Sequence, residues 1–215
     1  MANECYAGNL GAEFTRMTPP ASTQDDSLAF VQACQHGQRD AFGQLYQRYA
    51  PMVHGILLAR VPRQEVDDLV HEVFLRALSR LQSLRNASRF GPWLAAITRN
   101  MANDYHRDSR TRSDQNEHTV AADEISAPDH PSEKREAKEI LKIIRALPEA
   151  YRETLILRLV EGMTGPEIAA KTGLAHGSVR VNLHRGMQRL REKLDAHQAP
   201  SKSSKHQNAT IGEQR

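Results

Sequence analysis

Apolar residues recur at steps of three and four residues in the first half of the chain. One such face holds Phe42, Leu45, Tyr46 and Tyr49, which is the spacing of a helix that buries one side. Pro51 follows, so we expect this helix to end, kink or restart there. Two later stripes repeat the spacing and hold Val66, Leu69, Val70, Val73, Phe74 and Ala77, and then Trp93, Leu94, Ile97 and Met101. No alternating strand pattern of useful length interrupts them, so this half is predicted to be all-α.

The second half of the chain marks its helix ends with capping residues. Gly162 stands where a helix C-cap glycine is favoured, Thr164 and Glu167 have the spacing of a capping box, and Gly173 makes a turn. The predicted inward residues are Tyr151, Leu155, Ile156 and Leu159 of a helix opened by Leu147-Pro148, and Val179, Leu183 and Leu190 of a longer helix at about 176–194. A helix, a glycine turn and a basic helix in this order predict a helix-turn-helix.

Composition divides the chain into five parts. We predict a flexible N-terminus at 1–24, a helical domain at 25–107, a linker at 108–134, a second helical domain at 135–194 and a disordered tail at 195–215. Between 108 and 136, eight acidic residues face four basic ones among scattered prolines, which is the composition of a tether. The expected fold class is therefore all-α, with two small helical domains joined by a flexible acidic linker.

Charge changes this picture through its distribution rather than its sum. Lysine and arginine number 29 and acidic residues 26, a net charge of +3 that says little about partners. Residues 178–194, however, carry five basic side chains and one acidic one, so this helix can meet phosphate and the acidic linker cannot. Aromatic residues make up only 5% of the chain, which predicts an aliphatic core and argues against a large β-sandwich.

The sequence lacks the signatures of several other protein classes. No apolar run approaches the roughly 18 residues of a membrane span, and the first residues do not resemble an export signal, so a cytoplasmic protein without membrane insertion is expected. Cys5 and Cys34 are too few for a disulfide scaffold. The ten histidines are scattered, and no phosphate-binding loop, dinucleotide fingerprint or nucleophile elbow occurs. We expect no enzymatic activity, no cofactor and no metal.

The basic helix of the second half carries side chains that suit a DNA major groove. Arginine pairs with guanine, asparagine pairs with adenine, and an apolar side chain can meet a thymine methyl group. The alternative is a plain helical bundle with a solvated basic face. The candidate DNA-reading residues are Ser178, Arg180, Val181, Asn182, His184 and Arg185.

Two segments of the first half also carry candidate chemistry. Residues 65–77 are acidic on one side and apolar on the other, which is typical of an ordinary amphipathic helix or of a docking face for a basic partner helix. Residues 90–107 interleave one tryptophan and one tyrosine with basic and amide side chains. Single-stranded DNA binding uses this combination, because bases stack on aromatic rings while cations hold the backbone. For Trp93 taken alone a core position is slightly favoured, whereas for the whole stretch DNA binding is favoured.

These motifs, in this order, resemble the bacterial sigma-70 family in its extracytoplasmic-function (ECF) group. The resemblance covers residues 27–107 and 137–193. In the first part it rests on Ala41-Phe42, on Tyr49-Ala50-Pro51, on the run from Val66 to Ala77 and on Trp93-Leu94, Ile97, Arg99-Asn100 and Asp104. In the second part it rests on Leu147-Pro148, Tyr151-Arg152, Glu161-Gly162, Glu167-Ile168-Ala169, Gly173, Gly177-Ser178-Val179-Arg180 and Leu183-His184-Arg185-Gly186.

The resemblance implies a factor that binds core RNA polymerase and directs promoter-specific initiation. It implies that the β′ clamp helices contact Asp67, Asp68, His71, Glu72 and Phe74, and that the second domain sits on the β flap and reads the minus-thirty-five element as duplex. It also implies that a segment opens the minus-ten element and captures a flipped base. The residues of that segment are Arg85, Asn86, Ser88, Arg89, Trp93, Arg99, Asn100, Asn103 and Arg107. Such factors are commonly held inactive by an anti-sigma factor.

Departures from the family pattern and rival interpretations remain. His71 stands where the family usually has glutamine, and Ala175 stands where an N-cap side chain is common, which can weaken that helix start by roughly 1 kcal/mol. Asn182 and His184 replace a more basic or aromatic pattern seen in some members, which concerns the promoter sequence read rather than the mode of binding.

One rival function is a free-standing helix-turn-helix regulator, and another is an interaction module without a DNA role.

Overall fold

The computed structural model describes residues 25–38, 40–113 and 131–203. Within these ranges it holds eight α-helices and three short 3₁₀ turns and no strand, which confirms the all-α prediction. The helices are α1 (Asp25–Gln35), α2 (Asp40–Leu58), α3 (Val66–Arg80), α4 (Phe90–Ser113), α5 (Pro131–Arg145), α6 (Glu149–Leu159), α7 (Gly165–Thr172) and α8 (His176–Ser203). The 3₁₀ turns are η1 (Arg63–Glu65), η2 (Leu81–Ser83) and η3 (Ala87–Arg89).

The first group of helices, α1 to α4, packs around α2. Helix α2 contacts α1, α3 and α4, and its core residues Leu45, Met52 and Ile56 have no exposed surface. They meet Val73 of α3 and Leu94 of α4, which are equally buried. The apolar stripes read from the sequence are therefore the faces that form this core, and burying each large aliphatic side chain contributes about 1.5–3 kcal/mol.

Helix α2 continues through Pro51, so of the three predicted outcomes an end and a restart are wrong, and a kink stays a prediction. Proline removes one backbone hydrogen bond and crowds the preceding turn. Buried residues lie on both sides of it, namely Tyr49 before it and Met52 and Val53 after it. Their packing keeps both halves of α2 in the same core, and tertiary burial outweighs the local penalty.

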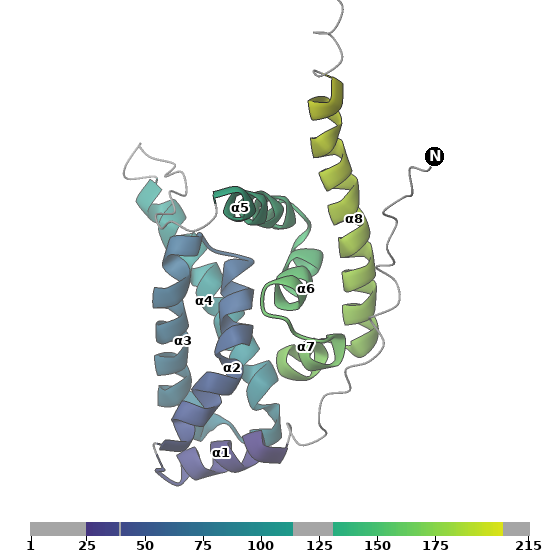
Figure 1. Cartoon of the computed structure of the whole chain (residues 1–215). Coiled ribbons are helices and arrows are strands. Elements are labelled where there is room, and N and C mark those ends of the chain that lie inside the picture. Colours follow the sequence, from purple (N-terminus) through teal and green to yellow (C-terminus); the bar gives the residue numbers. More distant parts are fainter. Residues whose placement is uncertain (1–24, 39, 114–130, 204–215) are drawn as a thin grey trace, which may run out of the picture.

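The second group of helices, α5 to α8, is organised around α6. Five consecutive residues of α6 are buried, from Glu153 to Leu157, so this short helix is covered on all sides. One side packs against α8 and another against α2, and Figure 1 shows α6 between these two helices. Tyr151 is half-buried and Leu159 is 47% exposed, so the predicted buried face is wrong at Leu159. Glu153 and Leu157 are buried in α6 instead of Leu159.

The predicted capping box and the Gly173 turn of the second group are confirmed, whereas α6 has its C-cap at Val160 rather than at Gly162. The Thr164 side chain accepts from the Glu167 N–H, and the Glu167 carboxylate accepts from the Thr164 N–H at 2.8 Å, which is a complete capping box. This bond to the backbone N–H of Thr164 is the main cause that lowers the pKa of the Glu167 carboxyl. Gly162 and Gly173 adopt left-handed φ values of 67° and 76°, which residues with a side chain rarely adopt.

The helices extend further than the predicted domain limits. Helix α4 runs to Ser113 and α5 begins at Pro131, so both enter the predicted linker at 108–134. Helix α8 runs to Ser203, so the tail predicted to be disordered from 195 is helical in its first part. Adding residues to a helix that has already formed is less costly than starting a new one, so these helices can continue beyond the last apolar contact. The predicted N-terminal segment 1–24, residues 114–130 and residues 204–215 lie outside the described residues.

The two groups of helices are in direct contact. Helix α2 packs against α6 and α7, and α4 packs against α7. Glycines permit the close approach, because a Cβ on Gly55 of α2 would lie 2.7 Å from Leu157, and one on Gly91 of α4 would lie 2.8 Å from the Lys171 carbonyl oxygen. Gly173 meets Pro92 of α4 in the same way, with a Cβ distance of 2.9 Å. We call this contact the interdomain seam.

Candidate polymerase and nucleic-acid interfaces

The outer side of α3 presents an acidic surface that nothing in the described chain covers. Asp67, Asp68, His71 and Glu72 are all exposed there. His71 donates from Nδ1 to the Asp67 carbonyl at 2.8 Å, because a carbonyl oxygen can only accept. This fixes the ring, so Nε2 of the neutral histidine is an acceptor. Four of the five predicted polymerase contacts are therefore brought together on one helix face.

The fifth predicted contact, Phe74, lies elsewhere. It is only 3% exposed and packs between the rings of Phe42 and Tyr46, at centroid distances of 6.1 and 4.5 Å. Phe74 therefore holds α3 on α2 and offers no contact surface of its own. The apolar surface of this face comes instead from Leu75 and Leu78, which are 67% and 46% exposed. Sequence reasoning missed both, although an apolar residue on the polar side of an amphipathic helix is the signal that identifies them.

The predicted base-capture loop forms a short preorganised turn. Arg85, Asn86, Ser88 and Arg89 are all exposed. The Asn86 side-chain oxygen accepts from the Ser88 N–H at 3.1 Å and from the Ser88 hydroxyl at 2.6 Å, which caps η3. Asn86 and Ser88 thus shape the loop with polar atoms that could otherwise bind a base, and Arg85 and Arg89 add two exposed positive charges.

The predicted DNA residues of α4 fall into two environments. Asn100, Asn103 and Arg107 are exposed, and Arg107 donates to Asp104 at 3.0 Å. Trp93 is half-buried against the core, 5.8 Å from the Phe90 ring, which favours the core interpretation of this tryptophan.

Arg99 is the member of this set that another side chain already binds. Its Nη2 and Nε donate to the two carboxylate oxygens of Glu153 at 2.7 and 3.2 Å, in the fork geometry that arginine uses for carboxylates and phosphates. Arg60 donates from Nη2 to the same carboxylate at 2.9 Å and also pairs with Glu149. The Arg60 Nε is buried without a partner in the described residues.

Glu153 is the centre of this cluster and is only 6% exposed. Burial by itself raises the pKa of a carboxyl group, but hydrogen bonds and charge from Arg99 and then Arg60 outweigh it. The net result is a pKa below the usual value of glutamate, so Glu153 stays ionised. Sequence reasoning missed Glu153 and Arg60. The three consecutive apolar residues 155–157 indicate a helix buried on more than one side, but they do not indicate which side chains Glu153 meets.

The recognition helix, the first turns of α8, is open over most of its predicted surface. Ser178, Arg180, Val181, His184 and Arg185 are exposed. The opposite face is anchored in the core through the predicted inward residues Val179, Leu183 and Leu190, of which Leu183 is partly buried.

Asn182 differs from the other predicted DNA-reading residues. It is half-buried and lines a cavity of 350 Å³ together with Arg60, Arg99 and Glu149. The upstream-element residues are thus gathered on one helix, and one of them faces the first domain.

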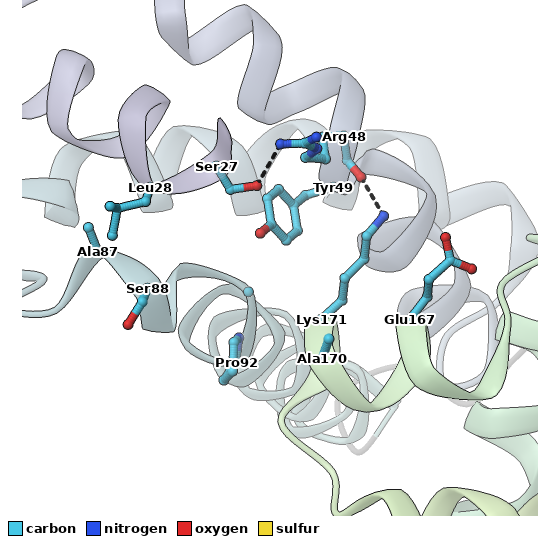
Figure 2. Close-up of a pocket in the computed structure, with 11 residues that line it drawn as sticks. Ser27, Leu28, Arg48, Tyr49, Ala87, Ser88, Pro92, Glu167, Ala170 and Lys171 are labelled. Carbon is cyan, nitrogen blue, oxygen red and sulfur yellow. Dashed lines mark hydrogen bonds between the residues drawn. The ribbon is translucent and has the colours of Figure 1, made fainter. Parts of the chain in front are cut away.

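A second cavity, of 390 Å³, lies along the seam between α2, α4 and α7 (Figure 2). Lys171 reaches across it, and its ammonium group donates to the Arg48 carbonyl at 2.9 Å and lies 5.6 Å from the Tyr49 ring centre. Burial is the main cause that lowers the pKa of Lys171. Arg48 in turn donates to the Ser27 hydroxyl at 2.9 Å. The base-capture loop borders this cavity through Ser88.

The described residues offer little for metal or membrane chemistry. No group of three or more histidine, cysteine, aspartate or glutamate side chains gathers in a way that could hold a metal ion within them. Among the helices of residues 25–38, 40–113 and 131–203, none combines the length and apolar character of a membrane span.

Two helical domains, the second with a capped helix-turn-helix and an exposed basic helix, define a DNA-binding transcription protein. Comparison with family models matches residues 45–112 to "Sigma-70 region 2" and residues 137–190 to "Sigma-70, region 4". The chain belongs to the sigma-70 family of RNA polymerase sigma factors, in its ECF group. Its two halves are thus the two domains of a transcription initiation factor, which favours the predicted sigma factor over a free-standing regulator.

Individual relatives support this assignment over most of the chain. RNA polymerase sigma factor CarQ of Myxococcus xanthus is 34% identical over 74% of this chain and 91% of its own length. The ECF RNA polymerase sigma-E factor of Escherichia coli strain K12 is 30% identical over 80% of this chain and 96% of its own. Among solved structures, CnrH in complex with the cytosolic domain of CnrY covers 80% of this chain and 99% of its own, with 25% identity and a TM-score of 0.58.

Proposed function

We propose that the outer face of α3 is the surface that binds core RNA polymerase, on the β′ clamp helices. The observation that carries this is the exposure of three carboxylates beside two exposed leucines on one helix. Apolar side chains surrounded by charge are typical of a protein interface, in which the apolar groups supply affinity and the charges supply orientation and rate of encounter.

The recognition helix is the proposed reader of the upstream promoter element. Arg180 and Arg185 are exposed on it, and the capping box and the Gly173 turn hold α7 against α8 as in helix-turn-helix proteins. The loop at 85–89 and the exposed side of α4 are proposed to hold the separated minus-ten strand, because they combine arginines with exposed amide side chains.

An anti-sigma factor is the proposed regulatory partner, with the chain acting in the cytoplasm. The similar solved structure of CnrH was determined with the cytosolic domain of CnrY, and the ECF relatives share both domains.

Run-off transcription tests this proposal. Purified protein is mixed with core RNA polymerase and the DNA upstream of its own gene, and we expect a discrete transcript that depends on the protein. Arg180→Ala and Arg185→Ala should weaken that transcript while polymerase co-purification is retained. Absence of both a transcript and polymerase binding would overturn the proposal.

A further inference from the structure

The cavity of 390 Å³ along the seam is lined by polar groups that the chain itself leaves unused (Figure 2). Helices α1, α2 and α7 and the start of α4 all contribute to its lining. Its volume falls in the range of about 300–1,000 Å³ that is usual for pockets that hold small molecules. The polar groups around it indicate which chemistry such a molecule would need.

The hydroxyl group of Tyr49 is the first unused group. This side chain is only 7% exposed, and its ring packs against that of Phe90 at a centroid distance of 5.0 Å. Within residues 25–38, 40–113 and 131–203, no group forms a hydrogen bond with the hydroxyl. Figure 2 shows it directed into the cavity. A buried tyrosine hydroxyl usually has a partner, so this one is available to a ligand.

The ammonium group of Lys171 is the second, because only neutral groups bind it. It donates to the Arg48 carbonyl at 2.9 Å and lies 5.6 Å from the Tyr49 ring centre, and no carboxylate in the described part of the chain forms an ion pair with it. Glu167 also lines the cavity, but its carboxylate accepts from the N–H and the hydroxyl of Thr164 at 2.8 and 2.7 Å. An ammonium group has three donors, and a buried charge favours a counter-ion, so Lys171 can take an anion.

Ser27 and an apolar wall complete the lining. Ser27 is 6% exposed, and its hydroxyl accepts from Arg48 at 2.9 Å, which leaves its own proton for another acceptor. Leu28 and Pro92 supply apolar surface, and Figure 2 shows Leu28 across the cavity from Lys171. The cavity can therefore hold the charged group of a molecule near Lys171 and an apolar body on the other side.

We propose that this cavity binds a small phosphate monoester that carries a compact ring, through Lys171, the Tyr49 hydroxyl and Ser27. Three donors from three helices suit the three terminal oxygens of a phosphate, whereas a carboxylate has only two. The inference goes beyond the proposed function, since none of these three residues is assigned to DNA or to polymerase. Because α7 supplies Lys171 and the first domain supplies the other two donors, the bound molecule stabilises the contact between the domains.

Isothermal titration calorimetry on the full-length protein tests the site with phenyl phosphate as the probe. Inorganic phosphate lacks the ring, and phenol lacks the charge. We expect phenyl phosphate to bind with one molecule per chain and each of the other two to bind about tenfold more weakly or less well still.

Tyr49→Phe removes the hydroxyl and leaves the ring. We expect it to weaken phenyl phosphate binding about tenfold, because a hydrogen bond to a charged group is lost, and to leave the melting temperature unchanged, because no group of the described chain loses a partner. Tyr46→Phe makes the same change one turn earlier on α2, where the ring packs against Phe74 outside the cavity. This control should bind phenyl phosphate as the wild type does.

Lys171→Met keeps most of the side-chain length and removes the charge. It should weaken phenyl phosphate binding by about tenfold or more, whereas Lys142→Met, at an exposed site on α5, should have no effect. Circular dichroism checks that each variant retains its helices, and Tyr49→Phe decides the matter if Lys171→Met does not fold.

Three results would overturn the proposed site. The first is no binding of phenyl phosphate by the wild type, and the second is binding that Tyr49→Phe and Lys171→Met both leave unchanged. The third concerns the source of the phosphate, which fluorescence anisotropy of a labelled single strand distinguishes. Weaker strand binding by Tyr49→Phe with unchanged phenyl phosphate binding would assign the cavity to the DNA backbone. The proposed function fails separately, since run-off transcription by the wild type, without phenyl phosphate, tests it.

Discussion

The two charged faces of the first domain differ in what already binds them. On α3, Asp67, Asp68 and Glu72 are exposed, and Glu72 makes a surface pair with Arg76 of the same helix at 3.5 Å. On α4, Arg99 is held by Glu153, a carboxylate from another domain that is 6% exposed. The type of residue is a poor guide to whether its charge is available, because availability depends on what packs beside it. The α3 carboxylates are open to a partner, whereas on α4 it is Arg99 that a carboxylate of the second domain already holds.

The largest effect is expected from removing Arg60. Its loss leaves Glu153 with one cation in a buried site, and breaking a buried ion pair typically costs about 3 kcal/mol or more. We expect Arg60→Ala to lower the free energy of unfolding by about that amount and to separate the unfolding of the two domains in calorimetry. Arg63→Ala, an exposed arginine on η1, is the matched control and should change stability by less than about 0.5 kcal/mol.

Leu75→Ala tests the α3 face of the comparison. Truncating an exposed leucine at the centre of a docking face should weaken polymerase binding about tenfold and leave stability nearly unchanged, because the side chain is 67% exposed. Binding to core polymerase can be measured by fluorescence anisotropy of the labelled protein. Leu159→Ala removes a similarly exposed leucine on α6, and an equal loss in both variants would remove α3 from its role.

Weakening the N-terminal cap of α7 should lower the stability of the fold without affecting the α3 face. Thr164→Ala deletes the N-cap hydroxyl of the capping box, which typically costs about 1 kcal/mol. Urea denaturation should show this loss, while polymerase binding through α3 stays unchanged. Thr164→Ser keeps the hydroxyl and should restore most of the stability, whereas a loss as large as that of alanine would mean that the hydroxyl is not what matters.

The smallest effect concerns pH at the edge of the seam. His54 of α2 shares a hydrogen bond of 2.6 Å with Glu161, and this bond is the main cause that raises the pKa of His54 above its ordinary value of about 6.5. A raised folded-state pKa stabilises the fold fully below pH 6.5, and the contribution is lost as pH rises through the raised value.

The measurement is the midpoint of thermal unfolding for the wild type and His54→Gln across that pH range. The wild type should lose a small advantage, about 1 °C, because water screens a side chain that is 37% exposed. Parallel curves for the two proteins would show that this pair contributes nothing to the pH dependence.

The sequence predicts those parts of the fold that depend on neighbours along the chain. The Thr164–Glu167 capping box and the Gly173 turn are local patterns and are confirmed, as are the helical stripes except at Leu159. Pro51 misled because its local penalty is outweighed by burial on both sides of it. Phe74 misled because its position on the helix was assigned to a surface from a resemblance, while its aromatic neighbours come from another helix.

The seam could not be read from the sequence at all. Glu153 can be buried because Arg60, just after α2, and Arg99 of α4 converge on it, and no spacing along the chain reports that convergence. The glycines of the seam look like any helix glycine until the partner helix is placed against them. For the same reason the exposed DNA-reading residues of α8 were found from helix pattern and charge, whereas the half-buried state of Asn182 was not.

The glycines of the seam also set a bias in how this protein can change by mutation. The fit of this contact surface depends on the absence of side chains at its glycines. Almost any substitution there adds bulk and separates the two surfaces, and very few improve the fit. Random alleles at Gly55 and Gly91 therefore lean toward proteins whose two domains fit less closely. In a library of random variants selected for stable folding, substitutions should be rare at these two positions and frequent at Gly43, where a Cβ meets nothing within 4 Å.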